Sequence, residues 1–307
     1  MATSLSAPRA QKTGPAAVDV ATSKTGPTGL VGALVPVVYN LYFSAIMSGV
    51  AEAVYEHEMG LVVWPTRHDH AREASLLHRL VHGATDGALI ILREQSNEEL
   101  VRLLADSSPF VVVDANLVLD ERIPCVSAAH RSGGDQAMRH LLALGHRRIA
   151  AITGPPGWVA TEDRRMAYRS ALADAGIERE PAFEVEARFE IEPGAVAART
   201  LLELRDPPTA IFAFNDSIAV GAMRVARERG VRVPEDLSIV GFDDITYASV
   251  VSPRLTTVRH PLAEMGRTAV GLLLGLLEPR RSGPLQIELP TRLVVRGSTA
   301  PPRATRR

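Results

Sequence analysis

The chain has 307 residues, of which 46% are hydrophobic and 22% are charged. A chain of this length can form one large domain or two ordinary ones with a substantial buried core. Its 35 acidic and 34 basic residues give a formal net charge of -1, which argues against binding to nucleic acid or membranes through bulk charge alone.

The cysteine content and the apolar segments restrict the class of protein further. A single cysteine, Cys125, excludes an internal disulfide and a cysteine-built metal centre. The amino-terminal sequence MATSLSAPRAQKTG has no apolar segment of signal-peptide length. The longest apolar stretches, 32–38 and 270–277, are far too short to span a membrane. We therefore expect a cytoplasmic protein with no membrane partner.

From Leu30 onward, apolar segments typical of buried strands alternate with amphipathic segments typical of helices. Residues 1–28, rich in Ala, Ser, Thr, Gly and Pro, are predicted to be a disordered arm, and 301–307 a disordered tail. Strands are predicted at 30–38, 61–64, 86–92, 110–114, 148–154, 183–187, 209–214, 237–242, 285–289 and 292–296. Helices are predicted at 42–57, 69–82, 96–105, 132–144, 161–175, 193–204, 216–229 and 261–277.

This alternation, with a break around 120–130, predicts an α/β fold of two doubly wound parallel-sheet lobes. In such folds a ligand binds at the carboxyl ends of the strands. We therefore expect a ligand cleft between the two lobes.

Enzyme signatures are absent from the sequence. It contains no phosphate-binding loop, no dinucleotide-binding glycine motif after a strand, no nucleophile elbow and no HExxH. We therefore predict no enzymatic activity and no cofactor. His78 and His82 are four residues apart on a predicted helix, with His68 and His70 before it. Solvated histidines are the usual explanation of such a pattern, and no metal site is predicted.

Polar residues directly follow three of the predicted strands. Asp114 ends FVVVD, Asn215 and Asp216 follow TAIFAF, and Asp243 and Asp244 follow LSIVGF. Such residues often cap the next helix, and we expect Asp216 and Asp244 to act mainly as caps or turn formers. Delivered to one end of the lobes, carboxylates and amides also suit a polyhydroxy ligand. The pattern alone leaves both interpretations open.

Several long segments point to one family. They are TGLVGALVPVVYNLYF, LLALGHRRIAAITGPP, DRRMAYRSALADAGI, PTAIFAFNDSIAVGAMRVARERGVRVPEDLSIVGFDD, SPRLTTVRHPLAEMGRTAV and LPTRLVVRGSTAPP. Together they resemble the lac-repressor (LacI/GalR) family of transcriptional regulators. The resemblance implies a type I periplasmic-binding-protein-like fold over 29–300, working as a homodimer. It implies a first lobe of about 30–128 plus 260–283 and a second of about 129–259 plus 284–300.

The resemblance also implies which side chains bind an effector between the lobes. Arg164, ten residues beyond Gly154, matches the arginine that typically donates two hydrogen bonds to a sugar or base. By their positions in the motifs, the other implied effector-binding residues are Asn215, Asp243, Asp114, His260, Phe189, Tyr39, Asn40 and Phe43. Phe189 and Phe43 have an alternative as core residues, and Asn40 as a helix cap. His146 is expected to be structural.

Two segments depart from the family pattern. Relatives usually carry an amino-terminal helix-turn-helix with a pattern like DVAxxAGVSxxTVSR, but VDVATSKTGPTGLVG passes directly into the first strand. No DNA-binding residues are therefore predicted in this chain. In SAAHRSGG, Ala129 and His130 stand where relatives usually have an Asp-Asn pair.

The sequence thus predicts a LacI-type transcriptional regulator, or its effector-sensing part. It would bind a sugar or related small metabolite in the cleft and control the DNA binding of a dimer, with operator DNA a partner of a full-length form. The alternative is a sugar-binding protein of a transport system, which requires export. An enzyme on the same scaffold is a third possibility, but the predicted cleft residues supply no nucleophile with an adjacent base.

Overall fold

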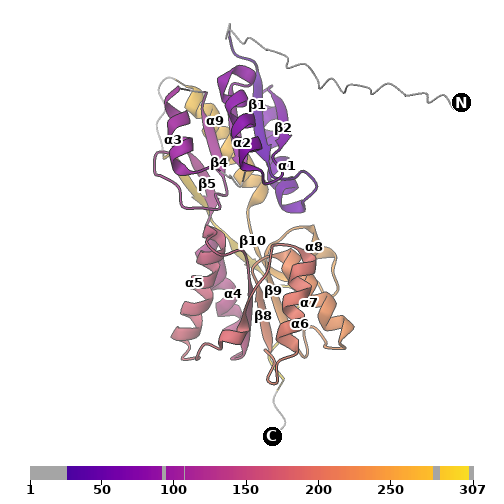
Figure 1. The fold of residues 1–307 in the computed structure, drawn as a ribbon. Coiled ribbons are helices and arrows are strands. Elements are labelled where there is room, and N and C mark those ends of the chain that lie inside the picture. The colour runs from indigo at the N-terminus through magenta and orange to yellow at the C-terminus, as the bar shows by residue number, and fades with distance from the viewer. Residues whose placement is uncertain (1–25, 92–94, 107, 279–283, 304–307) are drawn as a thin grey trace, which may run out of the picture.

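The structure, a computed structural model, describes residues 26–91, 95–106, 108–278 and 284–303. They form two α/β lobes, one above the other in Figure 1, each built on a six-stranded sheet. The predicted fold class is confirmed. Of the predicted amino-terminal arm only 26–28, and of the predicted carboxyl-terminal tail only 301–303, are among the described residues.

The first lobe is a parallel sheet with helices on both faces. Its strand order is β11-β5-β4-β3-β1-β2. The strands are β1 (Leu30–Val35), β2 (Gly60–Pro65), β3 (Gly87–Ile91), β4 (Phe110–Val113), β5 (Cys125–Ala128) and β11 (Gln286–Leu289). One face packs against α1 (Leu41–Glu56) and α9 (Leu262–Leu277), and the other against α2 (His70–Arg79), the π-helical turn η1 (Leu80–Ala84) and α3 (Asn97–Asp106).

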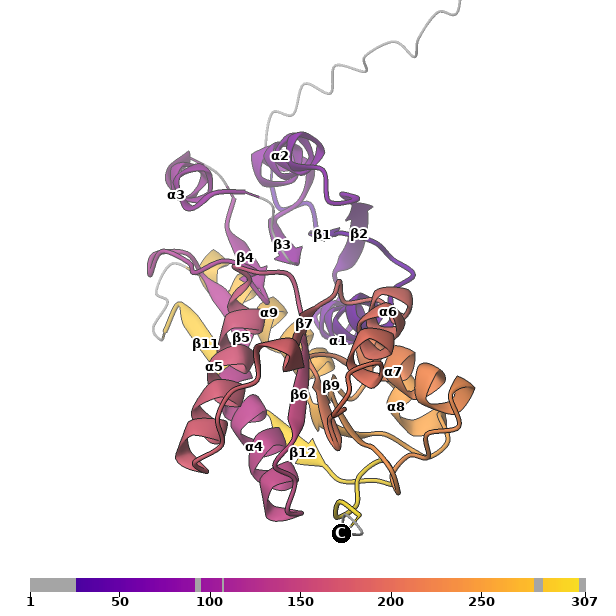
Figure 2. The same cartoon turned by 60° about the horizontal axis from the view of Figure 1, so that its bottom comes forward.

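The second lobe repeats this plan. Its sheet has the order β12-β10-β9-β8-β6-β7 and is parallel except for β12. The strands are β6 (Ile149–Thr153), β7 (Glu184–Glu186), β8 (Ala210–Ala213), β9 (Ser238–Asp243), β10 (Thr256–Arg259) and β12 (Arg292–Val294). Figure 2 shows α4 (His130–Ala143) and α5 (Val159–Asp174) on one side of these strands, and α6 (Ile191–Leu202) and α7 (Asp216–Glu228) on the other. The short helices η2 (Pro181–Phe183) and α8 (Thr246–Val250) complete the lobe.

The chain passes between the lobes three times, and one of these passages corrects the predicted lobe boundaries. The crossovers connect β5 to α4, β10 to α9 and β11 to β12. Because β11 pairs with β5 of the first sheet, residues 286–289 belong to the first lobe and not to the second, where they were predicted. Two of the crossovers are bonded to each other, because the Thr291 hydroxyl donates to the Ala129 carbonyl oxygen at 3.0 Å.

Most predicted elements are present within two or three residues of their expected ends. The strands β5 and β10 and the helix α8 were not predicted. The predicted helix over 69–82 is instead α2 ending at Arg79, followed by η1, which breaks at Gly83 with a φ of 114°.

His146 has the structural role that was expected. Its Nδ1 lies 2.9 Å from Thr209 Oγ1, and its Nε2 lies 3.0 Å from Ser238 Oγ and 2.9 Å from the Ala300 carbonyl oxygen. The buried ring therefore joins the starts of β8 and β9 to the carboxyl-terminal segment.

Helices α1 and α9 cross at two glycines, which lets their backbones touch. A Cβ atom on Gly49 would lie 1.8 Å from the Ala263 carbonyl oxygen, and one on Gly266 would lie 2.2 Å from that of Ile46. No side-chain rotation can relieve a clash with backbone, so this crossing accepts no larger residue.

We predict that Gly49→Ala lowers the free energy of unfolding by about 1–3 kcal/mol, because the helices must move apart. The control is Gly271→Ala on α9, where an added Cβ would meet nothing within 4 Å. That change should raise stability by up to about 1 kcal/mol through helix propensity. Equilibrium urea unfolding measures both, and equal effects of the two substitutions would contradict the prediction.

Candidate functional site

A cavity of about 690 Å³ lies between the lobes, at the carboxyl ends of the strands of both sheets. Its volume is within the range of about 300–1,000 Å³ that is usual for small-molecule sites. The first lobe contributes Val37, Tyr39, Asn40, Tyr42, Phe43, His68, Asp114, Ala115 and Asn116. The second contributes Pro155, Trp158, Ala160, Arg164, Arg188, Phe189, Glu190, Asn215, Ser217, Asp243 and Ile245.

Eight of the nine residues expected to bind an effector line this cavity; they are Arg164, Asn215, Asp243, Asp114, Phe189, Tyr39, Asn40 and Phe43. The ninth, His260, lies behind Asp243, with its Nδ1 3.4 Å from Asp243 Oδ1. Tyr39 is at the mouth, where 84% of its surface is exposed, whereas Phe43 is buried in the core of the first lobe. The structure thus brings the predicted set together, and Phe43 is both a core and a lining residue.

Asp114, directly after β4, receives hydrogen bonds on both carboxylate oxygens. The Tyr42 hydroxyl donates to Oδ2, and His130 Nε2 lies 3.0 Å from Oδ1. Burial alone would raise the pKa of this carboxyl, but His130, His260 and the Tyr42 hydrogen bond hold it well below its ordinary value. Asp114 is therefore an anion inside the protein.

The partners of His130 determine its tautomer. Arg164 can only donate hydrogen bonds, and its Nη2 lies 3.2 Å from His130 Nδ1. His130 Nδ1 is therefore the acceptor, and the ring proton is on Nε2, where it is donated to Asp114. Burial lowers the pKa of His130, which favours this neutral form.

Arg164 is 3% exposed and contacts protein groups through its terminal nitrogens and the face of its guanidinium. Its Nη1 donates to the Phe214 carbonyl oxygen, and its Nη2 lies 3.9 Å from Asp243 Oδ1. The guanidinium carbon lies 3.7 Å from the centre of the Phe242 ring. The resemblance implies that this arginine donates two hydrogen bonds to a ligand. In this structure each terminal nitrogen donates one of its two N–H groups to a protein acceptor, and Nε is buried without a partner among the described residues.

Asp243 and His260 extend the polar network of Asp114, His130 and Arg164 to the second crossover. His260 Nε2 is buried without a hydrogen-bond partner in the described structure and lies 3.9 Å from Asp114 Oδ1. His130 begins α4 after the first crossover, and His260 follows β10 at the second. This polar network therefore connects the ends of β4 and β9 to two of the three passages between the lobes.

At two positions the structure supports both interpretations that the sequence left open. Asn40 caps α1 by accepting a hydrogen bond from the Tyr42 backbone N–H at 2.8 Å. Asn215 caps α7 by accepting one from Ile218 N, also at 2.8 Å. Each uses its Oδ1 for the cap and lines the cavity as well. Capping leaves the amide N–H groups of Asn215 for a ligand.

The second polar residue after each of two strands, Asp216 and Asp244, has a structural role. Asp216 does not cap α7; its carboxylate accepts from the Thr257 hydroxyl and the Ile245 backbone N–H. Burial and the nearby Asp243 raise the pKa of Asp216 well above its ordinary value. Asp244, with a φ of 57°, forms ion pairs with Arg259 and Arg296 and fits the expected role as a turn former.

Aromatic and apolar contacts cross the cleft. Within the second lobe, the ring centres of Trp158 and Phe189 are 5.9 Å apart, at the edge of the cavity. Trp158 and Ile245 belong to the second lobe but pack against the core of the first. The Val159 backbone N–H also donates to the Asn116 carbonyl oxygen at 2.9 Å. The two lobes are therefore in direct contact on the Trp158 side.

Among the residues of this site that the sequence did not assign, four take part in the contacts described above: Tyr42, Asn116, His130 and Trp158. Tyr42 and Asn116 each stand two residues after a residue that was singled out, and Trp158 follows the TGPPG turn. His130 was noted only as a departure from the family pattern. Their roles arise from contacts between segments distant in sequence, which no local pattern reports.

Asp114, His130 and His260 also bring three potential metal-ligand atoms within 4.8 Å of one another. However, His130 directs a proton, not a lone pair, toward Asp114, and the Arg164 cation is adjacent. The trio therefore fits a hydrogen-bonded network better than a metal centre. The helix histidines His78 and His82 stack on each other, with ring centres 4.0 Å apart.

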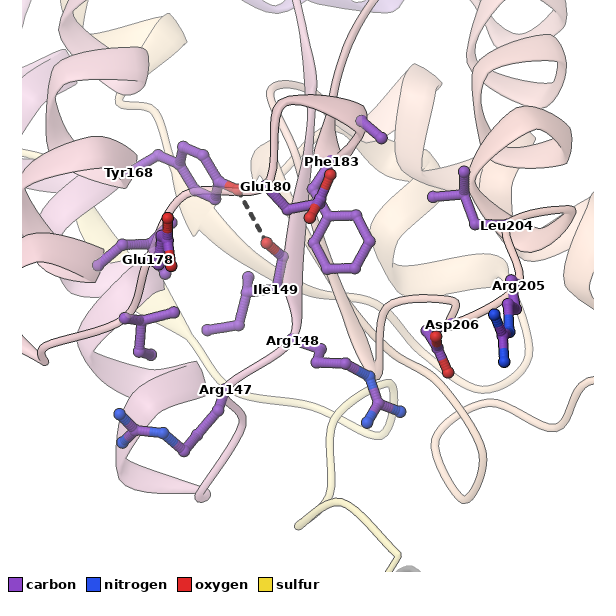
Figure 3. Close-up of a pocket in the computed structure, with 13 residues that line it drawn as sticks. Arg147, Arg148, Ile149, Tyr168, Glu178, Glu180, Phe183, Leu204, Arg205 and Asp206 are labelled. Carbon is purple, nitrogen blue, oxygen red and sulfur yellow. Dashed lines mark hydrogen bonds between the residues drawn. The ribbon is translucent and has the colours of Figure 1, made fainter.

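A second depression, of about 340 Å³, lies at the opposite end of the second lobe, around the first residue of β6, Ile149 (Figure 3). Its Tyr168 hydroxyl donates to the Ile149 carbonyl oxygen at 2.8 Å. Arg147 and Arg148 donate to backbone carbonyl oxygens at 3.1 Å. Because it adjoins the amino end of β6, this depression is not the expected ligand site.

Comparison with known proteins gives one consistent result. Residues 138–299 match the periplasmic binding protein-like domain. The chain is 35% identical over 254 residues to the ribose operon repressor of Haemophilus influenzae, covering 82% of this chain and 75% of the relative. The chain belongs to the LacI family of transcriptional regulators.

Solved structures agree with this assignment. A LacI family transcriptional regulator from Mycobacterium smegmatis has a TM-score of 0.78 and 33% identity, over 89% of this chain and all of that one. The regulator CelR, in complex with cellobiose, has a TM-score of 0.79 and 31% identity, over 89% and 85% of the two chains. These relatives are regulators and not enzymes, and they favour the regulator over the transport protein. Among the described residues, no helix has the length and apolar character needed to cross a bilayer.

The His130 network predicts a dependence of stability on pH. Burial lowers the pKa of folded His130, whereas the unfolded chain regains a value of about 6.5. Below about pH 6.5 the unfolded state therefore binds more protons, and the free energy of unfolding falls as the pH falls. Burial of His146 acts in the same direction. Urea unfolding at pH 7.5 and 5.5 measures the loss.

In His130→Asn, the amide can donate to Asp114 and accept from Arg164 but cannot titrate. This variant should show a weaker pH dependence, and the same substitution at exposed His78 should leave it as in the parent. Full pH dependence in His130→Asn would show that His130 does not carry the effect.

Proposed function

We propose that this LacI-family regulator binds a sugar or related small metabolite in the cleft. Binding would control the attachment of a homodimer to operator DNA in the cytoplasm. The observation that carries the proposal is the cavity itself, which gathers eight of the nine expected side chains between the lobes. Polar groups mixed with aromatic walls suit a polyhydroxy ligand.

The relatives support the same ligand class. One is named a ribose operon repressor, and the structure of another contains cellobiose. A ligand in this cavity would touch Asn116 of the first lobe and Asn215 of the second, and would therefore favour one arrangement of the lobes. It shifts the equilibrium only by the difference between its affinities for the two arrangements.

The coupling between ligand binding and the arrangement of the lobes would pass through the crossovers. His130 and His260 lie on two of them and contact Asp114 and Asp243, whose carboxylates face the ligand space. A change in the relative position of the lobes must change these contacts, because Asp114 and Asp243 belong to different lobes. The same motion would alter the surface through which the dimer forms.

Thermal unfolding against a panel of neutral sugars tests the ligand class. A sugar present at a hundred times its dissociation constant stabilises the folded state by about 2.7 kcal/mol, which raises the melting temperature by several degrees. No shift with any sugar in the panel would contradict the proposal.

Asn215→Ser provides the site-specific test. Serine keeps the cap of α7 but lacks the amide N–H groups, so we expect affinity for the sugar to fall about fivefold to tenfold with little change in stability. The matched control is Asp69→Ser, which replaces the cap of α2 outside the cavity. Titration calorimetry on both variants measures the difference, and unchanged affinity in Asn215→Ser would place the ligand elsewhere.

A further inference from the structure

We infer that the cleft selects hydroxyl-rich ligands without negative charge, and that Asp114 and Asp243 make this selection by balancing the charge of Arg164 within the protein. The inference rests on the proposed function, since it concerns the ligand of the same site. It divides the sugars into two groups: neutral sugars, which bind, and phosphorylated or acidic ones, which are rejected.

The inner wall of the cavity has no positive charge to spare. Its one arginine, Arg164, faces two carboxylates, Asp114 and Asp243, and donates to His130 and a backbone carbonyl. With neutral His130, the two acids and one arginine leave a net charge of -1. An anionic ligand would therefore meet buried negative charge without a free cation, which disfavours it.

The outer wall does not change this balance. Arg188 and Glu190 lie at the mouth of the cavity and pair with each other at 3.7 Å between Nε and Oε1. Their side chains are 76% and 58% exposed, so solvent screens both charges. Arg188 thus offers weak attraction to an anion, and Glu190 offsets it.

The hydrogen-bonding character of the wall points the same way. Asn116 Oδ1 is buried and has no hydrogen-bond partner among the described residues, so it calls for a donor. Asp243 meets Arg164 and His260 through Oδ1, which leaves Oδ2 as a second acceptor. A hydroxyl group donates to such acceptors, whereas the oxygens of a carboxylate or a phosphate dianion cannot. Two acceptors from opposite lobes therefore favour hydroxyl-bearing ligands independently of the charge count.

The experiment compares matched pairs by titration calorimetry at constant ionic strength and pH 7.5. The pairs are ribose with ribose 5-phosphate, glucose with glucuronate, and cellobiose with cellobionate. For each pair in which the neutral sugar binds, we expect the anionic partner to bind at least about tenfold more weakly. Equal or tighter binding of the anionic partner overturns the inference and leaves the proposed function standing. Binding of neither member in any pair overturns the proposed function, and this inference with it.

Asp243→Asn identifies the cause of the selection. Asparagine has the same shape and tolerates the φ of 112° at this position, and one acid remains to pair with Arg164. The ratio of the anionic to the neutral dissociation constant should fall at least about threefold. Asp114→Asn gives the same test at a φ of 51° if the first variant does not fold. Glu203→Gln, a change of the same charge at an exposed site away from the cavity, should leave the ratio unchanged. Equal loss of affinity for both ligands in Asp243→Asn overturns the assignment.

Discussion

The buried guanidinium of Arg164 is the group on which the site depends. A charge this far from water is stable only when it is paired and hydrogen-bonded, and removing one partner of a buried pair costs about 3–5 kcal/mol. Arg164 obtains that pairing from Asp243 in its own lobe and, through His130, from Asp114 in the other. Arg164 of α5 thus links the carboxyl end of β4 in the first lobe to the carboxyl end of β9 in the second. Any change in the relative position of the lobes must rearrange this network.

The backbone at both acids is held in an unusual conformation. Asp114 and Asp243 have φ values of 51° and 112°, which non-glycine residues rarely adopt and which cost about 1–3 kcal/mol each. Both turns direct a carboxylate toward the space between the lobes instead of along the sheet. Such strain persists only where the surroundings hold it, and here the holding groups are Tyr42, His130 and His260. The strained turns and the polar network therefore stabilise one another.

The sequence predicted the fold well because buried parallel strands and amphipathic helices leave strong local patterns. It missed β5 and β10, which are only four residues long; β5 has a serine between apolar residues, and Val258 is the single apolar residue of β10. It placed β11 in the wrong lobe because pairing with β5 joins segments about 160 residues apart. The site shows the same limit. Asp114 and Asn215 were found because they follow strands, whereas the Tyr42 hydroxyl reaches Asp114 across 72 residues of sequence.

The arrangement of Arg164 bears on how the proposed ligand would act. The family resemblance implies that this arginine donates hydrogen bonds to the ligand. Here its terminal nitrogens donate to the Phe214 carbonyl oxygen and to His130 Nδ1. Ligand hydroxyls would then bind first to the open acceptors, Asn116 and Asp243. A hydroxyl bound to Asp243 weakens the hold of that carboxylate on His260, which lies on the second crossover. The Asp243 carboxylate would thus both bind the ligand and transmit its effect to the second crossover. No separate pathway between the ligand and the crossover is needed.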